Sequence, residues 1–320
     1  MNKISVVIPY YNESNTITET FDLVVNQSFD PNEVIFINSN SNDSSENILK
    51  KLISSYKGKI IFKNINTNSS TPSQAKNIGI SNANNEIIAF MDCDMFFSKN
   101  WLKDQIYLLD KNPHINVIFG VSKLIGKSVF DKCCVIQTYG FNKLRPTIPS
   151  SLVRKKIFNN KNNLFLEFKA LYDSYWIKNV IKSKKSIVNT QAIINYANIE
   201  YANNFKILIK KAIYYSTPSI YIYKTKTIIF ISLSIILLIY SLKNFIFGIF
   251  ITNLYFLLRI FLIPLYKSNF KNIYSHINYR LDILFMTGLL LDIGKLIGYG
   301  YGFLKYVFKR NNNIFYHYNR

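Results

Sequence analysis

The chain has 320 residues, of which 49% are hydrophobic, so it can bury the cores of one or two domains. This composition excludes a largely disordered protein. The net charge is +21, and from Lys206 to the end 15 basic residues stand against two acidic ones. Because this charge alternates with long apolar runs and no nucleic-acid-binding motif accompanies it, we expect membrane lipids as a partner and no nucleic acid.

The first hundred residues alternate between short apolar segments and stretches with helical spacing. The apolar segments are rich in Ile, Val and Phe, which is typical of parallel strands buried on both faces. We predict strands over residues 4–8, 33–37, 59–62 and 86–91, helices that begin near residues 15 and 45, and a helix over 73–80. The alternation predicts an α/β fold with a mostly parallel sheet flanked by helices.

Polar turns follow three of the predicted strands. They contain Asn12 after the first strand, residues 38–43 after the second and residues 92–94 after the fourth. Ligands of parallel sheets bind at the carboxyl ends of the strands, beside the point where the strand order reverses. These turns are therefore predicted to form one binding site.

After residue 100 the pattern becomes less regular. We predict a helix over 101–109, a strand over 117–121 and a helix over 165–182. The Lys- and Asn-rich segment 123–163 shows no clear period. The α/β domain is expected to extend over residues 1–205, followed by a basic and aromatic linker over 206–226.

The C-terminal part contains hydrophobic segments that predict membrane helices. Residues 228–242 carry no charge and residues 245–266 carry only Arg259, and a membrane span needs about 20 residues. Nothing polar in this region could cover two such helices in a soluble core. We therefore predict a membrane hairpin within a membrane region over 227–310, followed by a tail over 311–320.

Residues 281–308 form a third apolar stretch, which also contains acidic and basic residues. It can either cross the membrane or lie at its surface. Basic residues flank the hairpin at both ends, so the positive-inside rule places both ends in the cytoplasm. A further crossing would carry the basic residues at the end of the chain outside. We therefore favour a helix at the cytoplasmic interface.

Asp92 and Asp94 are the strongest chemical signal, because they lie two residues apart where a predicted strand ends. Two such carboxylates can share one Mg²⁺ or Mn²⁺ with the oxygens of a phosphate, since these hard cations take few carboxylates when phosphate is bound. A solvated turn is the alternative, because Asp-x-Asp also occurs by chance. The neighbouring motifs favour the metal site.

Four stretches follow one another in the first hundred residues: ISVVIPYYNE at 4–13, NSNSNDSS at 38–45, SQAKNIGI at 73–80 and IIAFMDCD at 87–94. In sequence and order they resemble the motifs of the family 2 glycosyltransferases, whose nucleotide-binding fold is called GT-A. The resemblance covers roughly residues 1–180 and is strong up to Leu102. The Gln-x-x-Arg-Trp motif of processive synthases is absent, which argues against a cellulose- or chitin-type polymerase.

The resemblance implies which residues would bind the nucleotide. The turn with Pro9, Tyr11 and Glu13 would hold the base, with Glu13 near the ribose, and Asp43 would help to close the base pocket. Asn38 stands where the family usually has an Asp that contacts the base or ribose, so it can form hydrogen bonds but brings no charge.

The resemblance also implies how the diphosphate and the metal would be held. Lys76 would approach the diphosphate, with a solvated helix lysine as the alternative. Asp92 would contact the ribose or the ion, and Asp94 would ligate the ion. Mg²⁺ or Mn²⁺ would then neutralise the leaving diphosphate.

The catalytic base is implied less directly. An inverting transfer needs a carboxylate that accepts the proton of the acceptor hydroxyl. The family usually supplies it from a Glu-Asp pair at the start of a helix. Here Asp173 matches the Asp and Tyr172 replaces the Glu, Glu167 is the rival, and a third possibility is that neither serves.

The whole pattern implies a membrane-anchored, metal-dependent, inverting glycosyltransferase of the hexosyltransferase type. It would move a sugar from a UDP-, dTDP- or GDP-linked donor to a lipid-linked or surface-glycan acceptor, in the biosynthesis of a cell-envelope polysaccharide. We expect it at a bacterial-type inner (cytoplasmic) membrane with its catalytic domain facing the cytoplasm. A chain that ends near Asn204 should then be soluble and bind the donor.

Two other functions compete with this interpretation. A catalytically degenerate nucleotide-sugar-binding or scaffold protein would explain Asn38, Asn40 and Tyr172. A sugar-nucleotide pyrophosphorylase would need a glycine-rich phosphate loop near the N-terminus, and residues 9–15 contain no glycine.

Overall fold

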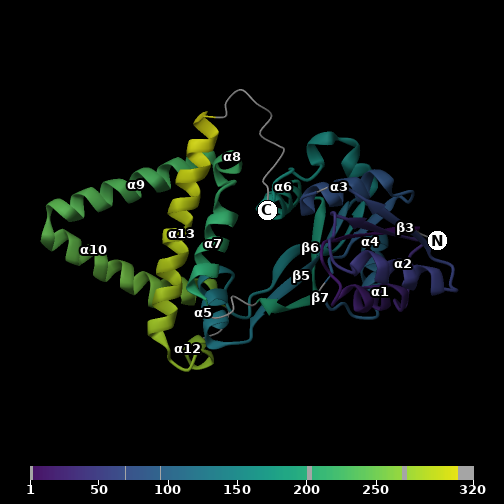
Figure 1. Ribbon diagram of the computed structural model, residues 1–320, viewed down its shortest axis with the longest axis horizontal. Coiled ribbons are helices and arrows are strands. Elements are labelled where there is room, and N and C mark those ends of the chain that lie inside the picture. Colours follow the sequence, from purple (N-terminus) through teal and green to yellow (C-terminus); the bar gives the residue numbers. More distant parts are fainter. Residues whose placement is uncertain (1–2, 69, 94, 200–203, 269–271, 309–320) are drawn as a thin grey trace. The chain divides into compact units, whose positions relative to one another are not determined.

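The computed structural model describes residues 3–68, 70–93, 95–199, 204–268 and 272–308. The chain forms two compact units (Figure 1). The first, the α/β unit, comprises Met1–Lys123 and Leu144–Tyr196, and the second, the helical unit, comprises Leu124–Lys143 and Ala197–Arg320. The chain therefore enters the helical unit twice.

The α/β unit is built on a seven-stranded sheet. Its strands are β1 (Ile4–Tyr10), β2 (Glu33–Asn38), β3 (Ile61–Asn66), β4 (Ile87–Phe90), β5 (Val117–Gly126), β6 (Arg145–Arg154) and β7 (Ser186–Ile199). The order is β3-β2-β1-β4-β6-β5-β7, in which the first four strands pair in parallel and β6 runs antiparallel to both of its neighbours. The predicted α/β fold with a mostly parallel sheet is confirmed.

Helices flank the sheet because their apolar residues recur on one side. They are α1 (Ile17–Val25), α2 (Ser45–Ser55), α3 (Pro72–Asn82), α4 (Trp101–Lys111) and α6 (Tyr172–Lys182), with 3₁₀ turns at Lys155–Asn159 and Lys161–Asn163. In α1 the buried residues include Ile17, Phe21 and Val24, as the helical spacing predicts. Helix α3 begins at a capping box, in which Thr71 and Gln74 satisfy each other's backbone N–H groups.

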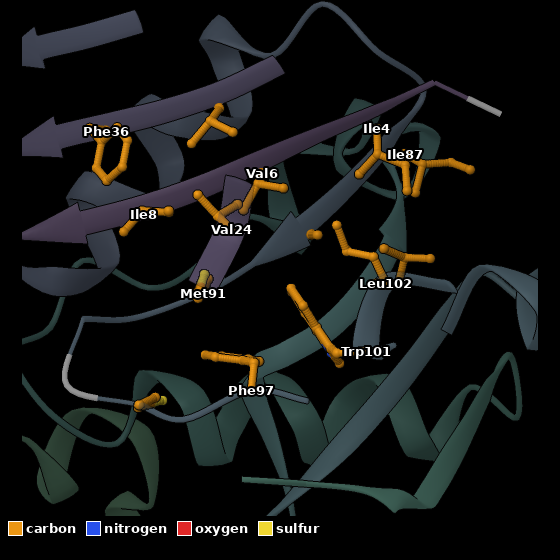
Figure 2. Packing of buried hydrophobic residues seen from close by; sticks show 14 of the residues in the cluster. Ile4, Val6, Ile8, Val24, Phe36, Ile87, Met91, Phe97, Trp101 and Leu102 are labelled. Carbon is orange, nitrogen blue, oxygen red and sulfur yellow. The ribbon is translucent and has the colours of Figure 1, made fainter. Parts of the chain in front are cut away.

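Alternate residues of β1 point into different cores. Ile4, Val6 and Ile8 pack in one cluster with Phe36 and Trp101 (Figure 2). Val7 packs on the opposite face, in a cluster that also includes residues of α3 and α6. Both faces of the sheet are thus covered, which explains the nearly continuous apolar strands.

The predicted helix over 165–182 is wrong in its first part, because α6 begins only at Tyr172. Leu171 adopts a left-handed conformation (φ 65°), which interrupts a helix. The backbone of Phe165 is instead bonded to α3, where the Asn77 side chain accepts from its N–H (3.0 Å) and donates to its carbonyl (2.9 Å). A tertiary contact therefore overrides the local helical pattern.

The helical unit contains the C-terminal apolar segments. Its helices are α5 (Val129–Thr138), α7 (Phe205–Ser216), α8 (Ser219–Ile222), α9 (Lys224–Lys243), α10 (Phe245–Leu257), a π-helical turn (Leu258–Leu262), α11 (Ile263–Lys267), α12 (Ile273–His276) and α13 (Leu281–Phe308). Helices α9 and α10 form a hairpin (Figure 1). Two helical stretches in the described part of the chain, Lys224–Lys243 and Phe245–Lys267, are long and apolar enough to cross a membrane.

Helix α5 lies within the segment that showed no clear period, and it belongs to the core of the helical unit. Phe130 and Cys134 pack with Leu208 of α7 and Leu291 of α13. On another side, Cys133 and Ile136 pack with Ile273 of α12, with Ile277 directly after that helix and with Leu284 of α13. The segment between β5 and β6 is thus an integral part of the helical unit.

Candidate functional site

The turn after β1 is bonded to the loop after β2. Residues 12–14 and 41–45 are joined by four hydrogen bonds: Asn12 N–H to Ser41 Oγ (3.0 Å), Asn42 N–H to Asn12 Oδ1 (2.9 Å), Glu13 N–H to Ser45 Oγ (2.7 Å) and Ser14 N–H to Asp43 Oδ2 (3.0 Å). Asn12 and Asn40 both have positive φ values, 55° and 64°, a conformation that Asn adopts more readily than most residues. The two polar turns predicted to share a site are therefore brought together.

Asn38 is 2% exposed at the end of β2. Its Oδ1 accepts from the Ser41 N–H (2.9 Å) and its Nδ2 donates to Glu46 Oε2 (3.3 Å). Both polar ends of this side chain therefore hold the loop together. A contact between Asn38 and a nucleotide stays a prediction.

Two carboxylates of these turns differ in their electrostatics. Burial opposes the charge of Asp43, but hydrogen bonds from Ser45 and from the Ser14 backbone outweigh it and lower the pKa of Asp43 to about 2. Burial raises the pKa of Glu13, a hydrogen bond from the Thr16 hydroxyl (2.5 Å) opposes this, and the charges of Asp92 and Asp43 add to the rise. Glu13 therefore lies in a region of negative potential.

Pro9 and Tyr11 are half-buried at the end of β1. Between them, Tyr10 points inward and its hydroxyl donates to Asn64 Oδ1 (3.0 Å). The structure thus places Pro9 and Tyr11 at the carboxyl end of the strand, next to Glu13. Their contact with a base stays a prediction.

Lys76 and Asp92 form an ion pair at the centre of the site. Lys76 comes from α3 and Asp92 follows β4, and Lys76 Nζ lies 2.6 Å from Asp92 Oδ1. The Lys76 side chain is 1% exposed, whereas that of Asp92 is 27% exposed. The alternative of a solvated surface lysine is therefore wrong.

The third partner is Tyr172, the first residue of α6. The Lys76 ammonium lies 6.0 Å from the centroid of the Tyr172 ring and hydrogen-bonds its hydroxyl. Burial alone would lower the pKa of Lys76, but Asp92 and Tyr172 outweigh it and raise that pKa above its usual value. Burial raises the pKa of Tyr172 to about 12, so its phenol stays neutral at pH 7.

The two candidate bases lie in different surroundings. Asp173 is exposed in the first turn of α6, directly after Tyr172, and its Oδ1 accepts from the Ser174 N–H (2.7 Å). Glu167 is half-buried, and its Oε2 accepts from the side chain of Gln74 in α3 (3.1 Å). Asp173 is therefore the more accessible carboxylate.

Asp94 lies outside the described residues. Among those that the structure describes, no group of three or more His, Cys, Asp or Glu residues could hold a metal ion. A complete protein cage is not required, since Mg²⁺ and Mn²⁺ sites often combine one or two carboxylates with substrate phosphates.

The role of Tyr172 was missed by sequence reasoning, which treated this residue only as a departure from the Glu-Asp pair. Its contact with Lys76 joins residues 96 positions apart, and local patterns carry no information about such a pair. The position next to Asp173 was the single signal that could have drawn attention to it.

Comparison with known proteins identifies the family of the α/β unit. Residues 5–148 match the model of glycosyl transferase family 2. The chain contains a family 2 glycosyltransferase domain. The predicted family and its GT-A fold are thereby confirmed.

Two curated relatives extend the comparison. Over 227 residues the chain is 26% identical to the poly(ribitol-phosphate) beta-N-acetylglucosaminyltransferase TarS of Staphylococcus aureus strain Mu50, covering 68% of this chain and 36% of TarS. Over 118 residues it is 35% identical to the minor teichoic acid biosynthesis protein GgaA of Bacillus subtilis strain 168, covering 35% of this chain and 26% of GgaA. The chain spans about a third of the length of the curated relatives it matches.

A solved structure shares the fold. The mannosyltransferase PcManGT from Pyrobaculum calidifontis, in complex with GDP-Man and Mn²⁺, is similar with a TM-score of 0.50 and 16% sequence identity. The similarity covers 66% of this chain and 61% of that one.

Proposed function

We propose that this protein transfers a sugar from a nucleotide diphosphate donor to a hydroxyl group of a cell-envelope acceptor. The single observation that carries the proposal is the Lys76–Asp92 pair at the carboxyl end of β4, in a family 2 glycosyltransferase domain. It lies at the point where the strand order reverses between β1 and β4, which is where α/β sheets bind their ligands. The two named relatives support a glycan acceptor.

The nucleotide would bind at the joined turns after β1 and β2. Pro9 and Tyr11 would hold the base, Glu13 the ribose, and Asp43 would close the pocket through its hydrogen bonds to residues 14 and 45. Because these hydrogen bonds already order the two turns, less ordering would be needed when the donor binds. A UDP-, dTDP- or GDP-linked sugar fits this proposal.

Asp92 and Asp94 would hold Mg²⁺ or Mn²⁺. Asp92 gives one oxygen to Lys76 and stays partly exposed, and the nearby charge of Glu13 adds to the negative potential, so the donor set suits a hard cation. When bound, the ion would offset the charge of the leaving diphosphate. Lys76 would keep the Asp92 carboxylate oriented.

Asp173 would act as the base that accepts the proton of the acceptor hydroxyl. Its exposed position at the start of α6 supports this role, because an incoming acceptor can reach it. Glu167 is the less favoured candidate, since its carboxylate is already bonded to Gln74.

The acceptor would be a polyanionic, phosphate-containing envelope glycan or its lipid-linked precursor. The net charge of +21 is complementary to such a polymer. The α9–α10 hairpin would anchor the enzyme in the cytoplasmic membrane, because its long apolar helices are largely exposed to solvent in the folded chain. The catalytic unit would face the cytoplasm, where nucleotide sugars are made.

The test is a donor screen with the full chain in detergent. UDP-, dTDP- and GDP-linked sugars are assayed for binding, hydrolysis and transfer, with Mn²⁺ and with a chelator. We expect one nucleotide class to bind, and transfer to be lost in Asp92→Asn and Asp94→Asn but kept in the control Asp104→Asn, an exposed carboxylate of α4. Donor binding without hydrolysis or transfer would instead indicate the scaffold function.

A further inference from the structure

Helix α13 is covered along one side by two short helices. A Cβ atom added at Gly294 would lie 2.6 Å from the Cβ of Ala212, and one at Gly298 would lie 2.7 Å from the carbonyl oxygen of Ile213. Gly302 lies equally close to the end of α7. Toward its N-terminus, α13 packs against α5, with Leu284 and Leu291 as the buried contacts; the side of α13 from Leu284 to Gly302 is therefore closed by α5 and α7.

Neither covering helix suits the interior of a bilayer. Helix α7 has 12 residues and carries Lys206, Lys210 and Lys211, and α5 has 10 residues and carries Asp131 and Lys132. Both are much shorter than the roughly 20 residues of a span. A transmembrane α13 would draw these charged helices into the hydrocarbon, where ionisable groups are strongly disfavoured.

The beginning of the hairpin meets the C-terminal end of α13. Lys224 Nζ, at the start of α9, donates to the hydroxyl of Tyr306 (3.0 Å). Two turns later, the rings of Phe230 and Tyr299 pack at 5.5 Å between centroids. The first part of α9 is thus attached near the end of α13.

The end of the hairpin meets the other half of α13. The rings of Phe256 in α10 and Phe285 lie 5.0 Å apart. The guanidinium of Arg259, in the π-helical turn, is bonded to Asp292 through Nε (2.7 Å). Phe285 and Tyr306 are 21 residues apart, which is about 31 Å along a helix, so the two ends of the hairpin are held far apart on α13.

Between these attachments the hairpin has little cover. Side chains on both of its helices are largely exposed, among them Ile236, Leu238, Leu242, Phe245, Ile246 and Phe250. The hairpin therefore leaves α13 sideways, and α9, α10 and α13 outline a triangle with α13 as its base (Figure 1). Both ends of a transmembrane hairpin lie on the same side of the membrane. Because α13 contacts both ends of this hairpin, α13 extends along that side.

The side of α13 that α5 and α7 leave open is apolar. Several large apolar side chains of α13 are exposed, Leu296, Phe303 and Val307 among them. Five others recur at helical spacing and are called the open stripe: Met286, Ile293, Ile297, Tyr301 and Leu304. Lys305 lies beside it, with its ammonium 4.4 Å from the centroid of the Tyr301 ring. An apolar stripe with flanking lysines and tyrosines is typical of helices at the membrane surface.

We infer that α13 is a surface helix that lies in the plane of the membrane, with its open stripe among the lipid headgroups and the first acyl carbons of an anionic bilayer. The inference rests on the membrane attachment in the proposed function. Helix α7 then faces the cytoplasm, and both ends of the hairpin leave the bilayer on that same side. The exposed basic residues at the start of α9, Lys224 and Lys226, contact anionic headgroups.

The first test is cysteine labelling of the full chain in cells. Single cysteines are placed at Asn278 before α13, at Asn311 after it and at Asn244 in the hairpin turn, and the parent chain, whose cysteines are buried, gives the background. With an impermeant maleimide, we expect Asn278→Cys and Asn311→Cys to react only after the membrane is permeabilised. If one of them but not the other is labelled in intact cells, α13 crosses the membrane and the inference is wrong.

The second test measures depth. Nitroxide labels at Ile293→Cys, Ile297→Cys and Leu304→Cys, in liposomes with anionic lipid, should all report one shallow depth, whereas a graded depth would mean that α13 crosses. Carbonate extraction of the full chain is run in parallel. Release of the protein from the membrane would remove the proposed membrane attachment itself, an outcome distinct from a membrane-bound chain whose α13 spans.

Discussion

Each unit of this protein buries a basic side chain against an aspartate, and the two pairs differ in what surrounds them. In the α/β unit, Lys76 is 1% exposed and its partner Asp92 is 27% exposed. In the helical unit, Arg259 is 5% exposed and its partner Asp292 is 20% exposed. The paired residues are 16 and 33 positions apart and come from different segments, so both pairs stabilise the tertiary structure.

The helical pair is a closed network. Asp292 also accepts from the Tyr255 hydroxyl (3.0 Å), and Lys295 lies 3.3 Å from it. Arg259 donates further to Gln137 Oε1 (2.9 Å), and Gln137 Nε2 donates to the carbonyls of Arg259 and Leu284. Buried polar groups that are fully bonded specify one packing arrangement.

In the described part of the chain, the pair in the α/β unit has fewer partners than the helical pair. Lys76 holds one oxygen of Asp92, while the Asp92 carboxylate remains partly exposed at the carboxyl end of the sheet. The two aspartates are similarly exposed, so the pairs differ mainly in how many further partners each aspartate has. The predictions that follow test this difference.

The largest effect is expected from removing the helical unit. A chain that ends at Asn204 keeps α5 but loses the residues of α7, α12 and α13 that bury Phe130 and Ile136, which costs about 1.5–3 kcal/mol for each of these side chains. We expect it to aggregate, contrary to the expectation from sequence. The matched control also replaces residues 127–143 with a short Gly/Ser linker, and it should be soluble and bind the donor in a thermal-shift assay.

If both truncated chains are equally soluble, α5 folds without its partners and the two units are more independent than their shared chain segments indicate. If neither is soluble, the α/β unit itself depends on the helical unit.

The second largest effect is expected at the candidate base. Asp173→Asn should lower kcat by about 10²–10⁴ and leave the donor Kd unchanged, because the general base acts in the chemical step and not in donor binding. Glu167→Gln is the matched control and should change kcat little. The opposite result would transfer the role to Glu167.

Removing the two buried cations should separate structure from chemistry. Arg259→Met removes the cation that bonds both Asp292 and Gln137. We expect the free energy of unfolding to fall by about 3 kcal/mol, since Lys295 and Tyr255 still bond Asp292. Lys76→Met leaves an Asp92 that water can reach, so transfer should fall by about 10–100-fold, as for partners that orient a metal ligand. Thermal unfolding and kcat/KM are measured for both variants. If Lys76→Met loses stability but keeps its kcat/KM, the Lys76–Asp92 pair is structural, like the Arg259–Asp292 pair.

A smaller effect is expected from Tyr172→Phe. The variant keeps the ring and removes one hydrogen bond to the buried ammonium, worth about 1.5 kcal/mol, so kcat/KM should fall about tenfold. The Mn²⁺ concentration for half-maximal rate should rise, because Asp92 is held less firmly. The control Tyr175→Phe, on the same helix, should match the parent chain.

The smallest effect concerns the pH dependence of stability. The pKa of Glu13 is raised in the folded protein, so its ionised form destabilises the fold at neutral pH, and this penalty disappears as the pH falls through that pKa. Glu13→Gln should therefore raise Tm at pH 7 but not under acidic conditions, while weakening donor binding. An equal gain at every pH would mean that the charge of Glu13 is not the cause.

Local pattern alone determined much of this protein. Continuous apolar runs predicted the parallel strands, since strands buried on both faces tolerate few polar residues. The apolar stretch over 281–308 coincides with α13. A long uninterrupted apolar pattern predicts a helix from the local sequence alone, whatever the helix packs against. The motifs up to Asp94 identified the family, since the turns they form lie next to the strands that carry them.

The tertiary structure decided what depends on contacts between distant residues. Leu171 interrupts the predicted helix, and Phe165 before it is bonded to Asn77 of α3. Helix α5 belongs to the helical unit because its apolar residues pack on helices more than 70 positions later. The partners of Lys76 were likewise decided by the packing of α3 and α6. A sequence pattern records which side of an element is buried, but the neighbour that buries it is selected by the packing of the whole chain.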